Sequence, residues 1–117
     1  MRSDVKGKRY CFITVVSVYF FLSAFVFPTS VYATGEIAAW GDNLYGKCAV
    51  PEPNTDFKAI AAGLFHSLGL KQDGSIVAWG SNGNGQCIVP SPNTDFVAVS
   101  AGGWHSLGLK SDGSIRA

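Results

Sequence analysis

Two histidines and two cysteines are the residues of this chain with the most capacity for chemistry. His66 and His105 are the only histidines, and they lie 39 residues apart, as do Cys48 and Cys87. Imidazole and thiolate groups can ligate a metal ion, but neither histidine has a partner at metal-ligand spacing. We therefore expect both histidines to be structural and to hydrogen-bond the backbone of their own repeat unit.

The cysteines could form a disulfide bond in an exported protein. A disulfide needs Cα atoms within about 7 Å of each other, and equivalent positions of successive repeat units commonly lie further apart. We expect Cys48 and Cys87 to be reduced, buried residues that act as small hydrophobic side chains.

Other patterns that could indicate a ligand have a structural explanation. Asn54-Thr55-Asp56 and Asn93-Thr94-Asp95 do not match a calcium loop and are expected to cap turns. The glycines of segment 80–85 lack the Lys-Ser/Thr ending of a phosphate-binding loop. Serine, histidine and aspartate recur in both halves, so no catalytic triad can be proposed. The sequence predicts no catalytic residue, metal or cofactor, and a protein that is not an enzyme.

The elements that position these residues are two copies of one unit. Residues 35–73 align without gaps with residues 74–112, and 25 of the 39 positions are identical. Trp40 falls on Trp79, which makes these tryptophans structural positions of the repeat. Identity at this level indicates an internal duplication.

Each unit reads as short strands between turns. In the second unit, residues 76–79, 87–89, 96–101 and 106–109 are apolar or alternating, and Gly, Asn, Asp or Pro separate them. Units of about 40 residues with four antiparallel strands, marked by Gly and Trp, are typical of β-propeller blades. The predicted fold is all-β, an incomplete propeller of about two blades.

The sequence also resembles a known repeat family. Residues 96–113 look like the repeat of the regulator of chromosome condensation family, as do residues 77–80 and the Asn-Gly-x-Gly-Gln that follows. Residues 86–90 resemble the ending of its compact bacterial-type version. The resemblance covers residues 35–117 and implies a propeller of about seven blades.

Two units are fewer than such a ring needs. Fewer than three repeats seldom stand alone, because each blade buries its faces against its neighbours. Residues 113–117 begin a third unit and stop where another Trp-Gly is expected. We expect the chain to be a fragment of a longer repeat protein; the alternative is a homo-oligomer that closes the ring.

The N-terminal third differs in composition. Residues 1–33 combine a basic start, an apolar stretch at residues 11–27 and a small-residue site ending at Ala33. These are the three parts of a secretory signal, which we expect to form a helix and to be cleaved after Ala33. The alternative is an uncleaved membrane anchor at residues 11–27. Residues 34–117 would then be the exported repeat domain.

Charge excludes one class of partner. Residues 34–117 carry five basic and seven acidic side chains, hence a net charge of −2. Nucleic-acid binding needs clustered Lys and Arg, which are missing here. The sequence predicts no nucleic-acid partner.

Loop positions that differ between the units are candidates for binding. Leu44-Tyr45 aligns with Gly83-Asn84, and Leu64-Phe65 aligns with Gly103-Trp104. Because aromatic residues are common interface anchors, we select Tyr45, Phe65 and Trp104 as a contact surface. The alternative is that these side chains only pack their own loops.

The sequence thus favours an exported, non-enzymatic scaffold that binds a protein partner. One alternative is a cell-surface carbohydrate-binding module in which these aromatic rings stack on sugars. Another is part of a larger enzyme or inhibitor whose site lies in other repeats. The fold does not decide among them.

Overall fold

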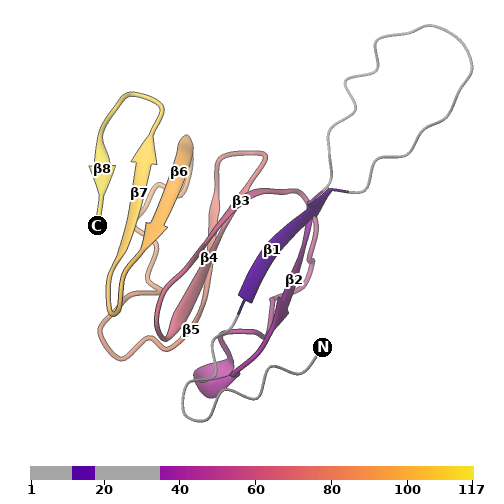
Figure 1. The fold of residues 1–117 in the computed structure, drawn as a ribbon. Helices are drawn as coiled ribbons and strands as arrows, with labels where there is room; N and C mark the ends of the chain where they lie inside the picture. The colour runs from indigo at the N-terminus through magenta and orange to yellow at the C-terminus, as the bar shows by residue number, and fades with distance from the viewer. Residues whose placement is uncertain (1–11, 18–34) are drawn as a thin grey trace, which may run out of the picture.

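The computed structural model describes residues 12–17 and 35–117, which form eight strands and one short 3-10 turn (Figure 1). In chain order the elements are β1 (Phe12–Ser17), β2 (Gly35–Trp40), η1 (Leu44–Gly46), β3 (Phe57–Ala62), β4 (His66–Lys71), β5 (Ile76–Gly80), β6 (Phe96–Ala101), β7 (Ser106–Lys110) and β8 (Ile115–Arg116). These ranges contain no α-helix, and the predicted all-β class is confirmed.

The strands form two antiparallel sheets, β1-β2-β3-β4-β5 and β6-β7-β8. Strand β2 joins β3 at a single pair, Gly35 with Phe57. The equivalent link joins the two sheets, where the Phe96 N–H donates to the Gly74 carbonyl at 3.0 Å. The described chain is therefore a row of three similar units: the β1–β2 pair, a first blade (β3–β5) and a second blade (β6–β8).

Each blade has three strands, and the fourth strand expected at residues 87–89 is not formed. The backbone there is occupied by local turns. The Cys87 N–H donates to Asn82 Oδ1 at 2.9 Å, and the Ile88 N–H donates to the Gly85 carbonyl at 2.9 Å. Because these bonds and the following Pro90 leave few groups for a ladder, the segment runs as a loop.

Strand β1 lies within the apolar stretch that was expected to be a signal helix. Residues 13–16 are Ile-Thr-Val-Val, and β-branched residues favour strands over helices. β1 pairs with β2 from Phe12↔Trp40 to Ser17↔Gly35. The other residues of the expected signal helix lie outside the described ranges, and cleavage after Ala33 stays a prediction.

The register of β1 repeats that of the blades. Phe12 pairs with Trp40 as Ser67 pairs with Trp79, the tryptophan of the next unit. β1 also contacts β3, as β4 contacts β6. The strand thus takes the place beside β2 that β4 takes beside β5.

The hydrophobic core lies between successive units. One cluster contains Leu68, Leu70, Ile76 and Phe96, and the other contains Ile37, Phe57 and Trp79. Each cluster draws on strands of two neighbouring units, so stacking the units is what buries the apolar side chains.

Each blade also holds a phenylalanine ring beneath a strand glycine. Phe57 and Phe96 are both 1% exposed. A Cβ placed on Gly108 would lie 2.5 Å from Phe96 Cε1, and Gly69 has the same relation to Phe57. Only glycine leaves room for these rings.

The Asn-Thr-Asp segments fasten each unit to the preceding one. Asn54 Oδ1 accepts from the Ile37 N–H at 2.8 Å, and Asn54 Nδ2 donates to the Ile37 carbonyl at 2.9 Å. Asn93 makes the same two bonds with Ile76, at 2.7 and 2.8 Å. The expected side-chain to backbone bonds are present, but these asparagines hold a strand instead of capping a turn.

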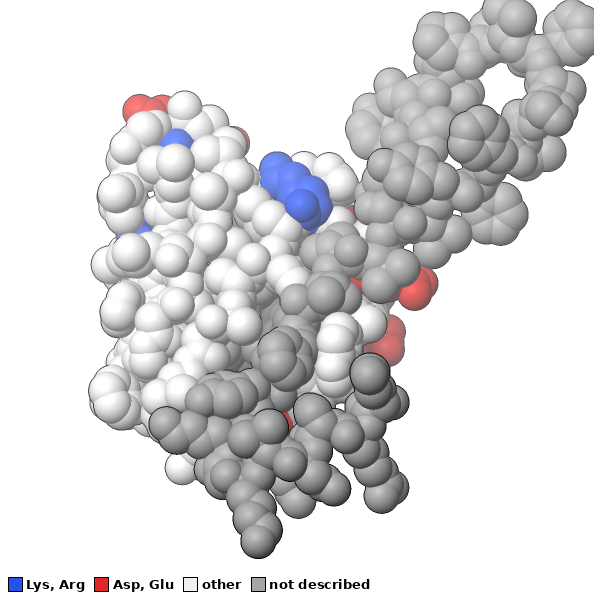
Figure 2. All heavy atoms as spheres, viewed as in Figure 1, with Lys and Arg blue, Asp and Glu red and all other residues white. Residues whose placement is uncertain are grey.

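The visible face of the described residues is mostly uncharged, with isolated basic and acidic side chains (Figure 2). Within the described part of the chain, no helix is long and apolar enough to span a membrane.

Candidate functional site

Tyr45, Phe65 and Trp104 lie side by side at one edge of the row of units. The ring centroids of Tyr45 and Phe65 are 5.7 Å apart in an edge-to-face arrangement, with an interplanar angle of 89°. Those of Phe65 and Trp104 are 5.9 Å apart at 35°. These distances are those of interacting aromatic pairs. We call these three residues the aromatic row.

Two equivalent turns position Phe65 and Trp104. The Gly63 N–H donates to the His66 carbonyl, and the Gly102 N–H donates to the His105 carbonyl, both at 2.9 Å. Each turn thereby closes a hairpin, β3–β4 or β6–β7. The Leu64 N–H reaches the Gly102 carbonyl at 3.4 Å, which ties one turn to the other across the blades.

Tyr45 is held by the loop that follows β2. Asn43 Oδ1 accepts from the Cys48 N–H at 2.8 Å, and the Asn43 carbonyl accepts from the Gly46 N–H at 2.9 Å. Tyr45 has a φ of 66°, which is uncommon for an aromatic residue. The loop thus holds a bulky side chain in a left-handed conformation beside Phe65.

The outer members of the row face solvent. Tyr45 is 58% exposed and Trp104 is 60% exposed, while Phe65 is half-buried between them. Leu44 and Leu64 are also exposed, at 56% and 50%. Five neighbouring apolar residues from one loop and two turns therefore form an apolar surface that is mostly exposed.

The nearby charges are neutralised. Lys47 Nζ lies 2.8 Å from Asp42 Oδ2 and donates to the Leu64 carbonyl at 3.3 Å. Its ammonium group thus fastens the Tyr45 loop to the Phe65 turn. Because Lys47 is buried and paired, it adds no free positive charge to the surface.

His66 is a structural residue with a different partner from the one we expected. Its Nε2 lies 2.9 Å from Ser106 Oγ in the second blade, and Ser106 Oγ donates to the Gln86 carbonyl at 2.7 Å. The prediction of a bond to the backbone of its own unit was wrong for this histidine. A fully buried imidazole needs a partner, and packing of the second blade supplies one.

His105 occupies the equivalent position but is exposed. No later blade among the described residues covers it. The described residues also contain no group of three His, Cys, Asp or Glu side chains that could hold a metal ion. The two equivalent histidines therefore lie in different environments, and a structural role for His105 stays a prediction.

The cysteines differ in state. Cys48 is disulfide-bonded, so the expectation that it is reduced was wrong. Cys87 is free and half-buried, and therefore is not the partner of Cys48. Its Sγ donates to the Ser81 carbonyl at 3.3 Å, and burial raises the pKa of the Cys87 thiol.

The two tryptophans of the repeat also differ. Trp79 is 7% exposed, and its Nε1 donates to the Lys47 carbonyl at 2.8 Å. Trp40 is 51% exposed. Trp79 is buried because it packs against Ile37 and Phe57.

Sequence reasoning did not select Leu44 and Leu64, which flank the aromatic row. Both stood in the loop pairs that differ between the two units, so the same difference signal could have found them. The bonds of Ser106 and Gln86 had no such signal, because they depend on how two blades meet.

One family model matches the first blade. Residues 57–86 match the family model of the regulator of chromosome condensation (RCC1) repeat. The match begins at the first residue of β3 and ends just beyond β5, so it spans the first blade. No curated protein sequence matches the chain.

Solved structures match over most of the chain. Prp20p of Saccharomyces cerevisiae, studied with its binding to Gsp1p and histones, matches with a TM-score of 0.60 and 24% identity, over 75% of this chain and 31% of that one. Yeast RCC1 (Prp20) bound to Kap60 matches with a TM-score of 0.57 and 26% identity, over 69% and 25%. The ectodomain of the Physcomitrella patens receptor kinase CR4 matches with a TM-score of 0.55 and 23% identity, over 68% and 22%.

These matches confirm the predicted repeat family and the propeller architecture. The chain spans about a third or less of each solved protein. What it has in common with them is a partial RCC1-type propeller.

Proposed function

We propose that this chain, which carries RCC1-type repeats, is an exported, non-enzymatic scaffold that binds a protein partner through the aromatic row. The observation that carries the proposal is the contact of Tyr45, Phe65 and Trp104. They come from three separate segments, and the outer two rings stay open to solvent. Large aromatic side chains grouped on a rigid frame are typical anchors of protein interfaces.

The apolar character of this surface favours a protein partner over a highly charged ligand. Leu44 and Leu64 extend it, and Lys47 near it is paired with Asp42. The solved relatives also support protein binding: Prp20p binds Gsp1p and histones, and yeast RCC1 binds Kap60. Partner identity is not transferred, because residues outside the match can make those contacts.

Export is proposed from residues 1–33. The basic start, the apolar stretch and the site at Ala33 support it. N-terminal sequencing of secreted protein should begin at Thr34. Protein that stays in the membrane with Met1 or Arg2 at its N-terminus would support the anchor instead.

Site-specific photo-crosslinking tests the binding surface. A benzophenone side chain at position 45 or 104 should capture the same protein from the organism's extracellular fraction. A benzophenone at Val97, an exposed residue of β6 outside the row, is the matched control. Equal capture at all three positions, or none at 45 and 104, would overturn the proposal.

A glycan array separates the alternative of sugar binding. Glycan binding that is lost in Trp104→Ala, without protein capture, would assign the row to carbohydrate. Light scattering on the purified chain also shows whether copies assemble, as closure of a ring would require.

A further inference from the structure

The loop that follows β5 contains two Asn-Gly pairs, Asn82-Gly83 and Asn84-Gly85. An asparagine side chain can cyclise onto the backbone nitrogen of the next residue, and glycine hinders this reaction least because it has no Cβ. The aligned residues of the first repeat are Asn43-Leu44 and Tyr45-Gly46, so neither pair occurs there. This chemistry therefore distinguishes two loops that are otherwise equivalent.

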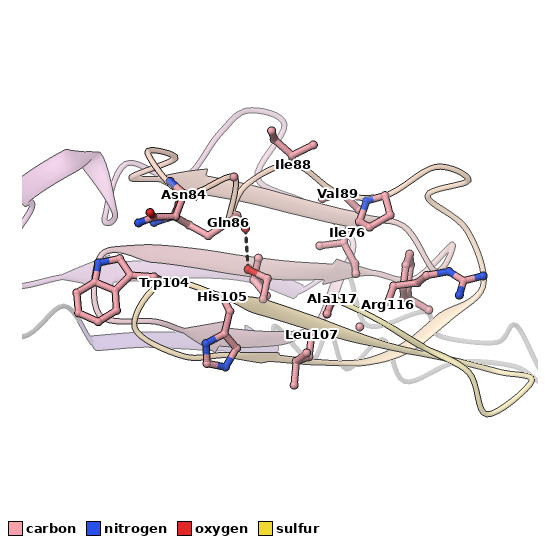
Figure 3. A pocket seen from close by; sticks show the side chains of 16 residues that line it. Ile76, Asn84, Gln86, Ile88, Val89, Trp104, His105, Leu107, Arg116 and Ala117 are labelled. Atoms are coloured by element: carbon pink, nitrogen blue, oxygen red, sulfur yellow. Dashed lines mark hydrogen bonds between the residues drawn. The ribbon is translucent and has the colours of Figure 1, made fainter.

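The loop is fastened at its two ends. Asn82 Oδ1 accepts from the Cys87 N–H at 2.9 Å. The Gln86 carbonyl accepts from Ser106 Oγ at 2.7 Å, and Figure 3 shows this bond with Asn84 on the same loop. These two bonds hold the loop in one conformation around its apex.

Water reaches the apex of the loop. Asn82, Gly83 and Asn84 are all exposed. Asn43, the equivalent of Asn82, is also exposed, although the first blade follows its loop. Exposure of Asn82 is therefore a property of the loop, and a following unit does not remove it.

The two Asn-Gly pairs differ in the backbone nitrogen that would attack. The Gly83 N–H has no hydrogen-bond partner within residues 12–17 and 35–117. The Gly85 N–H, in contrast, donates to the Asn82 carbonyl at 3.1 Å. A backbone nitrogen attacks after it loses its proton, and a hydrogen bond retains that proton. Gly83 is therefore the better nucleophile.

The two pairs also differ in the carbonyl that would be attacked. Attack on Cγ places negative charge on Oδ1, and the Cys87 N–H already donates to Oδ1 of Asn82. Donors aimed at an oxygen where charge develops lower the barrier to the reaction. Among the described residues, the Asn84 side chain has no such donor. Both differences favour reaction at Asn82.

We propose that Asn82 is a site of covalent modification, in which its side chain cyclises onto Gly83 and the ring then opens to aspartate or isoaspartate. The Gly83 nitrogen forms a bond to Asn82 Cγ, the Cγ–Nδ2 bond breaks, and Nδ2 leaves as ammonia with the proton of the Gly83 amide. Water then opens the succinimide ring at Cγ, which gives aspartate, or at the backbone carbonyl, which gives isoaspartate. The proposal goes beyond the protein-binding role and does not depend on it.

Incubation of the folded chain in mildly alkaline buffer, followed by peptide mass spectrometry, tests the proposal. Asn82 should gain the mass difference between a carboxylic acid and an amide well before Asn84 does. Asn43 is the matched control within the chain, because it accepts the same loop bond from Cys48 at 2.8 Å but precedes leucine. It should stay unmodified. A protease that cleaves before aspartate but not before isoaspartate separates the two products.

Gly83→Leu gives the second loop the residue of the first. Nothing lies within 4 Å of a Cβ added to Gly83, and Leu44 occupies the equivalent position, so the loop should be retained. The variant should lose the modification of Asn82 and keep the slower one of Asn84. The wild type in urea is a second measurement that needs no variant. Without the Cys87 bond, Asn82 and Asn84 should react at similar rates.

Four results would overturn the proposal. The first is faster modification of Asn84 than of Asn82 in the folded chain, and the second is equal modification of both. The third is modification of Asn82 in urea but not in the folded chain, which would show that the loop protects it. The last is modification of Asn82 in Gly83→Leu at the wild-type rate.

Discussion

His66 of the first blade and Ser106 of the second blade are joined by a hydrogen bond, with 2.9 Å between Nε2 and Oγ. Ser106 donates its own proton to the Gln86 carbonyl at 2.7 Å, so its oxygen must accept from His66. The proton of the neutral imidazole therefore lies on Nε2. Nδ1 of His66 is buried and has no hydrogen-bond partner among the described residues.

This arrangement predicts that acid destabilises the chain through His66. Protonation would place a second N–H at the unpartnered Nδ1, in a buried site. Burial, and next the charge of the nearby His105, lower the pKa of His66 below its usual value. The unfolded chain then binds the proton more readily than the folded chain, so stability falls as the pH drops below about 6.5.

Urea unfolding at pH 5 and pH 7.5 measures this effect. The midpoint of the wild type should fall at pH 5, and His66→Gln should reduce that fall. His105→Gln removes the equivalent but exposed ring and with it the smaller cause of the lowered pKa of His66, so it should reduce the fall less than His66→Gln does. A pH dependence that is the same in His66→Gln as in the wild type would contradict the assignment.

The strand glycines should not tolerate a methyl group. Gly108→Ala places a Cβ 2.5 Å from Phe96 Cε1, closer than carbon atoms can pack, so either the ring or β7 must shift. Overpacking of this kind costs typically about 1–3 kcal/mol. Gly103→Ala is the control, since nothing lies within 4 Å of its added Cβ. Thermal unfolding should separate the two variants, and equal melting temperatures would contradict the packing.

The asparagine that joins the second blade to β5 should matter to stability. Asn93→Ala removes two hydrogen bonds to Ile76, each worth roughly 0.5–1.5 kcal/mol, and leaves backbone groups unpaired. Asn93→Asp retains an acceptor for the Ile76 N–H but loses the donor to its carbonyl. We expect the free energy of unfolding to fall in the order wild type, Asp, Ala. An unchanged value in Asn93→Ala would show that the two bonds contribute nothing.

Cys48 and Cys87 should react differently with iodoacetamide. Cys87 is half-buried and its pKa is raised, so its alkylation should be slow at pH 7 and accelerate at higher pH than for an exposed cysteine. In the chain that retains residues 1–33, Cys48 should react only after reduction, since it is disulfide-bonded there. Peptide mass spectrometry reads both positions, and rapid labelling of Cys48 without reductant would contradict the disulfide.

Much of this structure could be predicted from the duplication. The 39-residue period places Phe57 on Phe96 and Asn54 on Asn93, and the structure gives each pair the same role. The aromatic row was also selected from sequence, because Phe65 and Trp104 differ between units that have identical scaffold needs. The strand predicted at residues 87–89 was wrong. An apolar triplet is typical of a strand, but here the backbone N–H groups donate to Asn82 and Gly85 in local turns.

Contacts between units could not be predicted in this way. His66 and His105 have the same sequence context, yet only His66 is covered by a following blade. The partner of His66 lies 40 residues away, and no local pattern marks it. The position of β1 beside β2 was also hidden, because an apolar stretch of β-branched residues suits both a signal sequence and a strand.

Removal of residues 1–33 should expose the edge of β2 that pairs with β1. Along an antiparallel strand, the backbone groups of successive residues point to opposite sides. Ile37 directs its N–H to Asn54, so the N–H groups of Glu36 and Ala38 point toward β1. In a chain that begins at Thr34, amide exchange should accelerate at Glu36 and Ala38 and stay slow at Ile37. Hydrogen exchange followed by NMR resolves single amides, and equal protection of Ala38 in both chains would show that β1 does not cover β2 in solution.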